Sequence, residues 1–503
     1  MPPLFHMPPG GGEMELLIPL NTKEARPMYE QIYQYIKDEI RNGNLRPRRQ
    51  LPSSRELAGS LKVSRSTTQL AYEQLVSEGY LEAEPRKGYF VATLDGILPP
   101  VKERRPEPAA LVQERSIQGG LGGGQTPDGR GGVGKEEEGV RVDFSIRGID
   151  LESFPYSTWR KISRGVLKEE EKDLFLKGDS QGDWELREAI RDYLHAARGV
   201  NCRTEQILVG AGNEYLLMLL SQLLGREVGI AMENPTYQQA WRVFSAMGHP
   251  VFPVGMDAGG FKASELPGLP VKAAYVMPSH QFPMGIVMPV RRRQELLAWA
   301  AGETGRYLIE DDYDSEFRYK GKPVPALQGL DRTGCVIYMG TFSKAIAPAI
   351  RVGYLVLPEA LLDRYERQAR FYSSTVSRVD QRILARFISG GYFERHLNRM
   401  REIYKGKHDA LLGSLRPLER EFEIQGEYAG LHVLLTHRGG RTEEELVRAA
   451  KEAGVRVYGL SGFYMREGQT AQTGTVLLGY ARLDEEEIRI GAGLLVEAYG
   501  CEA

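Results

Sequence analysis

The chain has 503 residues, of which 42% are hydrophobic and 26% charged, and its formal net charge is −2. This length and composition are typical of a folded chain of two or three domains. No apolar run approaches the roughly 18–20 residues of a membrane helix, and the start lacks a signal-peptide pattern, so we expect a cytoplasmic protein without a membrane partner. Its three widely spaced cysteines argue against a disulfide framework or a cysteine metal site, and no metal site is predicted.

Four zones of different composition follow one another. Residues 1–20 are expected to form a disordered tail, 21–92 a compact helical domain, and 93–141 a flexible linker rich in proline and glycine. Between residues 142 and 503, helical patterns alternate with short apolar strands. This alternation predicts an α/β domain with a mainly parallel sheet and helices on both of its faces.

The first compact domain carries a local excess of positive charge. Between Lys23 and Ala92 there are 12 Lys or Arg residues against 9 Asp or Glu residues. A basic surface on an otherwise acidic protein suits an anionic partner. Charge alone does not decide the matter, since an ordinary solvated surface would show the same count.

Three helices and a basic hairpin are predicted in this domain. Apolar spacing indicates a helix over 28–40, and a serine N-cap precedes a short helix that ends near Lys62. Ser64 can cap a longer helix over 65–78, after which two strand-like pieces flank a basic tip. Three helices followed by such a hairpin predict a winged helix-turn-helix.

The second helix of such a motif lies in the major groove of double-stranded DNA, with its N-terminal residues at the base edges. The polar run that fits this position is Arg65, Ser66, Thr67, Thr68 and Gln69. Arg86 and Lys87 at the tip of the wing are expected to reach phosphates or the minor groove. A helical interaction module without DNA affinity would leave both features unexplained.

The segments 51–58, 63–67, 79–81 and 86–91 closely resemble the GntR family of bacterial regulators. This resemblance covers the whole first domain. It implies that the partner is an operator in double-stranded DNA, with Ser53 and Arg55 among the contacting residues.

In the second domain, a strand-to-helix turn contains Ala211, Gly212 and Asn213. Backbone N–H groups at a helix N-terminus form a site for anions. Farther along, the apolar strand 307–309 leads into Glu310, Asp311, Asp312 and Tyr313. Acids at the end of a strand are often ordinary loop residues, so neither the turn nor the acids alone indicate a binding site.

Lys344 stands out among the lysines by its neighbours. Thr341, Ser343 and Arg351 supply donors that suit a phosphate, and a lysine that forms a Schiff base needs a closed pocket. The segment 338–354 resembles the lysine segment of fold-type-I enzymes of the aspartate aminotransferase family, which use pyridoxal 5′-phosphate (PLP). The resemblance implies the α/β fold of those PLP-dependent transferases, with a small C-terminal α+β subdomain.

The same resemblance assigns roles to further residues. It makes Lys344 the catalytic lysine that binds PLP as a Schiff base, with Thr341, Ser343, Arg351 and the turn 211–213 at the phosphate. Asp311 is expected at the pyridine nitrogen, with Asp312 as the competing choice, because a protonated ring is the better electron sink.

Four more positions follow from this resemblance. Tyr313 is expected near the ring hydroxyl, and Tyr237 is expected to stack on the ring, unless it is a core residue. Phe282 replaces the usual asparagine of its loop. Either His280 or Gln281 is expected to make the hydrogen bond in its place, and the sequence does not choose between them. Lys177 stands where a tyrosine reaches the partner subunit's phosphate, although an exposed surface lysine is an equal alternative.

Together the two halves resemble the MocR family of regulators, which fuse a GntR-type winged helix to an aminotransferase-like domain. The resemblance implies a head-to-tail homodimer in which each DNA-binding domain lies over the partner's large domain. It also implies that PLP, alone or with a small amine or amino acid, is the effector.

An alternative function is a working aminotransferase with an accessory domain. Aminotransferases of this family hold the substrate carboxylate with an arginine near the C-terminus, and here Leu477 takes that place. Arg482 is nearby but alternates to a different position. Loss of a bidentate arginine weakens both the binding and the orientation of an amino-acid substrate, so a regulator is favoured over an enzyme. A purely structural domain is disfavoured because Lys344, Asp311 and Arg351 are all present.

Overall fold

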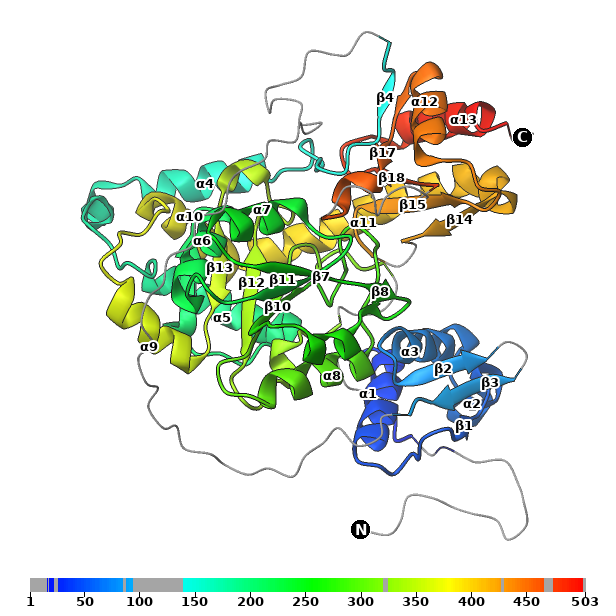
Figure 1. Cartoon of the computed structure of the whole chain (residues 1–503), viewed down its shortest axis with the longest axis horizontal. Helices are drawn as coiled ribbons and strands as arrows, with labels where there is room; N and C mark the ends of the chain where they lie inside the picture. The colour runs from blue at the N-terminus through cyan, green and yellow to red at the C-terminus, as the bar shows by residue number, and fades with distance from the viewer. Residues whose placement is uncertain are drawn as a thin grey trace.

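The computed structural model describes residues 16, 18–21, 26–84, 87–93, 139–319, 324–426, 429–465 and 474–500. Figure 1 shows a small N-terminal domain in blue, a large central domain and a C-terminal subdomain in orange and red. Nearly all of the predicted linker lies outside the described residues. No helix in the described ranges is long and apolar enough to span a membrane.

The N-terminal domain is a winged helix, as the sequence predicted. Its elements are α1 (Met28–Arg41), β1 (Gln50–Leu51), α2 (Ser54–Leu61), α3 (Arg65–Ser77), β2 (Leu81–Glu84) and β3 (Gly88–Val91). Ser53 and Glu56 form a capping box at the start of α2, and the Ser64 side chain accepts from Thr67 N at the start of α3. The three strands form an antiparallel sheet in the order β1-β3-β2.

The packed part of this domain begins earlier than the predicted boundary at residue 21. Leu16 and Ile18 fall in the predicted tail, yet both are buried in the core of the winged helix with Ile32 and Ile36. The physical reason is that these apolar side chains gain free energy when they leave water.

A seven-stranded sheet forms the centre of the large domain, in the order β5-β13-β12-β11-β10-β6-β7. The strands are β5 (Ile207–Gly210), β6 (Ile230–Glu233), β7 (Val251–Val254), β10 (Ala273–Val276), β11 (Tyr307–Asp312), β12 (Val336–Thr341) and β13 (Gly353–Val356). Only β13 runs antiparallel to its neighbours. The prediction of a mainly parallel sheet is therefore confirmed.

Helices cover both faces of this sheet, which confirms the predicted fold class (Figure 1). One face packs on α6 (Asn213–Leu224), α7 (Gln238–Ala246) and α9 (Glu359–Gln368). The other packs on α4 (Tyr156–Val166), α5 (Trp184–Arg198), α8 (Val290–Ala301) and α10 (Arg378–Ser389). Since successive strand residues point to opposite faces, Ile309 and Asp311 share the first face, whereas Leu308 and Asp312 share the second.

The C-terminal subdomain mixes helices with an antiparallel sheet, as predicted. Its elements include α11 (Tyr392–Leu415), β14 (Phe422–Gln425), β15 (His432–His437), α12 (Glu443–Glu452), β17 (Tyr458–Gly459), β18 (Thr475–Gly479) and α13 (Glu485–Ala498). The sheet order is β14-β15-β18-β17. Immediately after the linker, β4 (Val142–Asp143) pairs with β16 (Val455–Arg456), which fastens the start of the large domain to this subdomain.

Candidate cofactor site and nucleic-acid interface

Lys344 lies just beyond the carboxyl end of β12, at the edge of the sheet where open α/β proteins bind ligands. Its side chain is partly buried, and Nζ donates to Ile146 O at 3.1 Å. Burial lowers the pKa of Lys344 to about 8. A buried amine with a lowered pKa is a better nucleophile at neutral pH than an exposed lysine.

The predicted phosphate ligands gather at one end of three adjacent strands. Register places Gly353 of β13 opposite both Thr341 of β12 and Gly210 of β5. This brings the turn 211–213 next to Ser343 and Arg351. Thr341 Oγ1 accepts from Ser343 N at 3.1 Å and donates to Ser343 Oγ at 3.0 Å, which orients that hydroxyl.

The backbone conformation at position 212 favours glycine. Its φ is +86°, and a Cβ at this position would lie 2.7 Å from Arg351 Nη2. The Arg351 guanidinium therefore rests against the N-terminus of α6, where it also contacts Glu214 at 2.8 Å. Ala211 N, in contrast, already donates to Thr375 Oγ1 at 3.0 Å.

The structure separates the two acids that compete for the pyridine nitrogen. Asp312 forms a buried ion pair with Arg198 at 2.8 Å on the second face of the sheet. Asp311, which is 2% exposed, faces the other side and accepts from the Tyr275 hydroxyl through Oδ2. Its Oδ1 has no hydrogen-bond partner among the described residues. Burial raises the pKa of Asp311 to about 7, so a cationic group placed at Oδ1 would satisfy this carboxylate.

Aromatic rings gather on this face of the sheet, where Tyr237, Phe282 and Tyr313 pack against the cluster that contains Tyr275 and Ile309. Phe282 lies edge-on to Tyr237, at 6.2 Å between ring centroids, and edge-on to Tyr313, at 6.0 Å. The structure also favours one of the two alternatives in this loop. Gln281 Nε2 donates to Pro235 O and Phe282 O, and Gln281 Oε1 accepts from Met284 N. His280 Nε2, in contrast, has no partner in the described part of the chain.

Some residues of this site were missed by sequence reasoning. Asp314 Oδ2 lies 2.9 Å from His280 Nδ1, which is also 2.9 Å from the Tyr313 hydroxyl. His432 of β15 packs against His280 and Phe282, and burial lowers the pKa of His432 to about 3, which keeps it neutral. Tyr275 and Thr375 complete the set. Thr375 and His432 come from parts of the chain far from the predicted motifs, so no local pattern could have pointed to them. Asp314, in contrast, directly follows Tyr313, and Tyr275 lies in the strand before His280.

Lys177 is not brought to the other candidates by contacts within the chain. It is exposed in the loop before α5, next to the exposed Phe175 and Leu176. The prediction that it serves a partner subunit stays a prediction.

The position of the missing arginine is apolar. Leu477 is fully buried in a cluster with Leu434 and Leu460, against which Ile146 and Met284 pack. Arg482 is exposed instead, and its side chain lies against Gly148. The cluster around Leu477 therefore offers no cation that could bind a carboxylate at this position.

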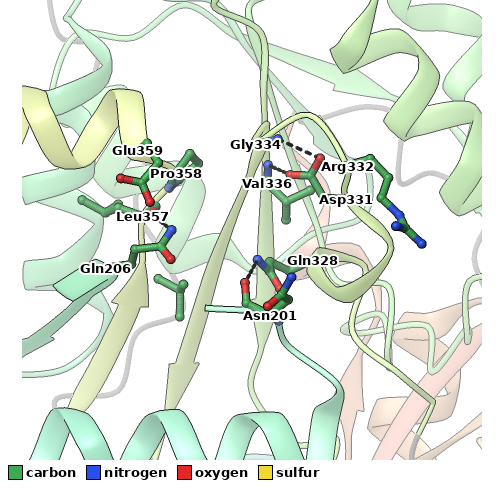
Figure 2. Close-up of a pocket in the computed structure, with 11 residues that line it drawn as sticks. Asn201, Gln206, Gln328, Asp331, Arg332, Gly334, Val336, Leu357, Pro358 and Glu359 are labelled. Carbon is green, nitrogen blue, oxygen red and sulfur yellow. Dashed lines mark hydrogen bonds between the residues drawn. The ribbon is translucent and has the colours of Figure 1, made fainter. Parts of the chain in front are cut away.

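A cavity of about 310 Å³ lies at the opposite end of the strands (Figure 2). Several of its polar groups bind one another or the backbone around the cavity. Asn201 and Gln328 exchange two hydrogen bonds of 2.8 Å, and Asp331 accepts from the backbone N–H groups of Gly334 and Val336. Val336 begins β12 whereas Lys344 follows its end, so this cavity is separate from the candidate cofactor site.

The polar run of the recognition helix faces solvent at most positions. Arg65, Ser66 and Gln69 are exposed and Thr67 is half-buried at the start of α3. Arg55 is also exposed, whereas Ser53 is half-buried and its hydroxyl caps α2. Lys87 on the wing pairs with Glu84 at 2.8 Å and is 71% exposed, and Arg86 lies outside the described residues.

Thr68 does not belong to this exposed set, contrary to the prediction. It is fully buried, and its hydroxyl donates to Ser54 O at 2.6 Å and Arg65 O at 3.0 Å. The reason is helical spacing: Thr68 shares a face with Ala71, Tyr72 and Leu75, all of which are buried. Its hydroxyl joins α3 to α2 instead of contacting DNA.

Replacing Thr68 with valine should therefore affect stability and not recognition. The lost hydrogen bond should lower the free energy of unfolding by about 1 kcal/mol. Urea unfolding followed by circular dichroism measures this loss, and a DNA titration of the folded variant should match that of the unchanged protein. A large fall in DNA affinity with unchanged stability would contradict the structural role.

Comparison with known proteins agrees with this architecture. Residues 28–91 match the model of "Bacterial regulatory proteins, gntR family", and residues 153–494 match that of "Aminotransferase class I and II". Among solved structures, the multiple substrate aminotransferase of Thermococcus profundus superposes with a TM-score of 0.64 at 27% identity, covering 72% of this chain and 92% of that one.

Relatives match over both domains together. The uncharacterized HTH-type transcriptional regulator YhdI of Bacillus subtilis is 39% identical over 95% of this chain and 97% of its own length. The probable rhizopine catabolism regulatory protein MocR of Rhizobium meliloti is 33% identical over 94% of each chain. The chain therefore belongs to the MocR family of HTH-type transcriptional regulators, which join a GntR-type winged helix to an aminotransferase class I and II domain.

Proposed function

We propose that this regulator binds an operator through its winged helix and binds PLP through Lys344, and that PLP is its signal. The observation that carries the proposal is the buried Asp311, whose Oδ1 has no partner in the described ranges. Asp311 pairs in register with Met339 of β12, so it lies toward the same end of the sheet as Lys344. A carboxylate at this position would hold the protonated pyridine nitrogen. The regulator would act in the cytoplasm, where bacterial DNA lies.

The donor set fits a phosphorylated aromatic aldehyde. Ser343, Arg351 and the N-terminus of α6 offer positive and N–H or O–H groups around Gly212, whose φ of +86° favours glycine. Tyr237 supplies a ring beside Asp311, and His280 Nε2 supplies a further donor or acceptor. PLP would supply an electrophilic carbon for Lys344 and an electron sink. The protein would supply the charged groups that hold and orient PLP, and the neutral amine of Lys344.

A homodimer would complete the site. Phe175 and Leu176, the two residues immediately before Lys177, are 72% and 65% exposed. Apolar side chains of this size favour a second copy of the chain as their cover. Lys177 would then reach the phosphate bound by the partner, and the two winged helices would face paired half-sites in the predicted head-to-tail arrangement.

PLP is favoured over an amino acid as the effector because of Leu477. An α-carboxylate placed against Leu477, Leu434 and Leu460 would lose its water without gaining a partner. The alternative is an amine or amino acid anchored by Arg482, which is exposed beside Gly148. An active aminotransferase would need the same anchor.

The effector can be tested by titration. Apo protein should turn yellow and saturate with PLP, and common amino acids added afterwards should leave the absorbance of the bound cofactor unchanged. DNA binding is followed in the same samples. A saturable spectral change with one amino acid, together with altered DNA binding, would replace PLP by that amino acid as the signal. A colourless protein that takes up no PLP would end the proposal.

A further inference from the structure

One continuous segment, Pro278–Arg293, runs from the candidate cofactor site to the winged helix; we name it the connecting segment. It begins with the loop that carries His280 and ends in the first turn of α8. The backbone N–H of Val290, the first residue of α8, donates to Glu78 O at 2.8 Å. Glu78 is the residue that ends the recognition helix α3. The two functional sites are thus joined through a single stretch of chain.

The contact with the winged helix is close. Val290 is 5% exposed and belongs to the core of the N-terminal domain. Gly79 has φ +76°, and a Cβ there would lie 2.7 Å from Pro289 Cβ. The void left between the two surfaces is about 20 Å³, little more than the space of one water molecule. The two domains are therefore in direct, closely packed contact at this point.

Glu78 is itself held firmly. Its carboxylate accepts from the Tyr33 hydroxyl at 2.8 Å and pairs with Lys37 at 2.9 Å, and both side chains come from α1. Gln74 Nε2 donates to the same carboxylate at 2.6 Å. With an exposed fraction of 3% for the Glu78 side chain, this network fixes the end of α3 relative to α1. Displacement of Glu78 would turn the whole winged helix.

The connecting segment is also rigid at its cofactor end. Arg293 is 2% exposed, and its guanidinium donates to Met288 O at 2.9 Å, Pro278 O at 2.8 Å and Pro325 O at 2.6 Å. It therefore ties the start of the loop to its end. Within the loop, Met288 N donates to Pro278 O at 3.0 Å. Because the two ends of the loop are held together, a displacement of His280 is expected to displace Val290 as well.

The docking leaves the DNA surface open. It uses the C-terminal end of α3, whereas Arg65 stands at the N-terminal end, about 20 Å away at 1.5 Å per residue. The contact therefore sets the direction of the recognition helix without covering it. In a dimer, a small turn of each helix changes the spacing of the two half-sites that the protein fits.

We propose that the connecting segment is the link through which cofactor occupancy beside His280 sets the docking of the winged helix and hence DNA affinity. Arg293 acts as its positioning residue. This inference rests on the proposed function, because it presumes that PLP and DNA bind to the chain. It holds whether a winged helix docks on its own large domain, as in the structure, or on the partner's.

Two glycines provide a matched test. Gly79→Ala pushes a methyl group into Pro289, whereas Gly43→Ala, at φ +77°, adds the same backbone strain with nothing within 4 Å. DNA affinity is measured by fluorescence anisotropy for apo and PLP-loaded full-length protein, with loading checked by absorbance. We expect a ratio of about fivefold or more between the two forms in the unchanged protein and in Gly43→Ala, and a ratio near one in Gly79→Ala.

Each outcome decides a different question. An equal ratio in both variants would overturn the link while PLP and DNA binding stand. A ratio near one in the unchanged protein would also overturn it, because there is then no signal to carry. Failure of the unchanged protein to bind PLP or DNA at all would instead sink the proposed function. Retention of PLP absorbance in Gly79→Ala shows that the large domain is intact.

Hydrogen exchange gives a second readout that needs no variant, should Gly79→Ala unfold the winged helix. In the unchanged protein, PLP should alter amide exchange in the peptide that contains Val290 and in the end of α3. Exchange that changes only around Lys344 and not in these two segments would contradict the proposal.

Discussion

Replacement of Lys344 with alanine should abolish borohydride-stable attachment of PLP while the chain stays folded. The change removes the amine and fills no space, and it relieves the cost of burying a chargeable group. Absorbance and mass mapping after borohydride treatment measure the attachment. In the unchanged protein, the label should lie on the peptide that contains Lys344. Lys161→Ala, at an exposed lysine of the same domain, is the control and should keep full labelling.

The pH dependence follows from the state of the amine. Burial lowers the pKa of Lys344 to about 8, and only the neutral amine attacks an aldehyde. The rate of attachment at low PLP should therefore rise about tenfold per pH unit below 8 and level off above it. Labelling of Lys344→Ala at another lysine with the same rate and pH profile would contradict the assignment.

Replacement of Arg65 with alanine should weaken operator binding by about 1–3 kcal/mol, or about 5- to 150-fold. Arg65 is the first residue of α3 and is exposed, so its side chain can reach a base edge when the helix enters the major groove. Titrations against the operator and against a scrambled duplex measure both affinity and discrimination. We expect the ratio between the two duplexes to fall together with affinity.

The control for Arg65 is an arginine of similar exposure far from the winged helix. Arg489 lies on α13 and pairs with Glu485 at 2.6 Å. Arg489→Ala should leave both titrations unchanged. If Arg65→Ala weakened the two duplexes equally, Arg65 would contact phosphate only, and if it weakened neither, the docking geometry would be wrong.

Local chemistry made much of the fold predictable. Ser53 and Ser64 marked helix starts because an N-cap side chain satisfies N–H groups that the helix leaves open. Strand alternation and the resemblance around Lys344 placed the cofactor candidates in one region. Thr68 could also have been excluded, since its spacing from Ala71 and Leu75 puts it on the apolar face.

The remainder depended on contacts between distant parts of the chain. The sequence already favoured Asp311, but the physical reason against Asp312 is its ion pair with Arg198, which lies on α5. Asp314 meets His280 because the strands that precede them, β11 and β10, are neighbours in the sheet, and His432 meets His280 because the subdomain packs against this loop. The contact of Val290 with Glu78 joins two domains that the linker separates in sequence, and the spacing of apolar residues along the chain does not predict it.

The central claim is that PLP bound at Lys344 controls DNA binding. The most direct test titrates a labelled duplex from upstream of the gene with apo and PLP-loaded protein, followed by fluorescence anisotropy at fixed salt. The account predicts affinities that differ by about fivefold or more, with the difference lost in Lys344→Ala. Identical titrations for the apo and the spectroscopically confirmed PLP-loaded protein would contradict it.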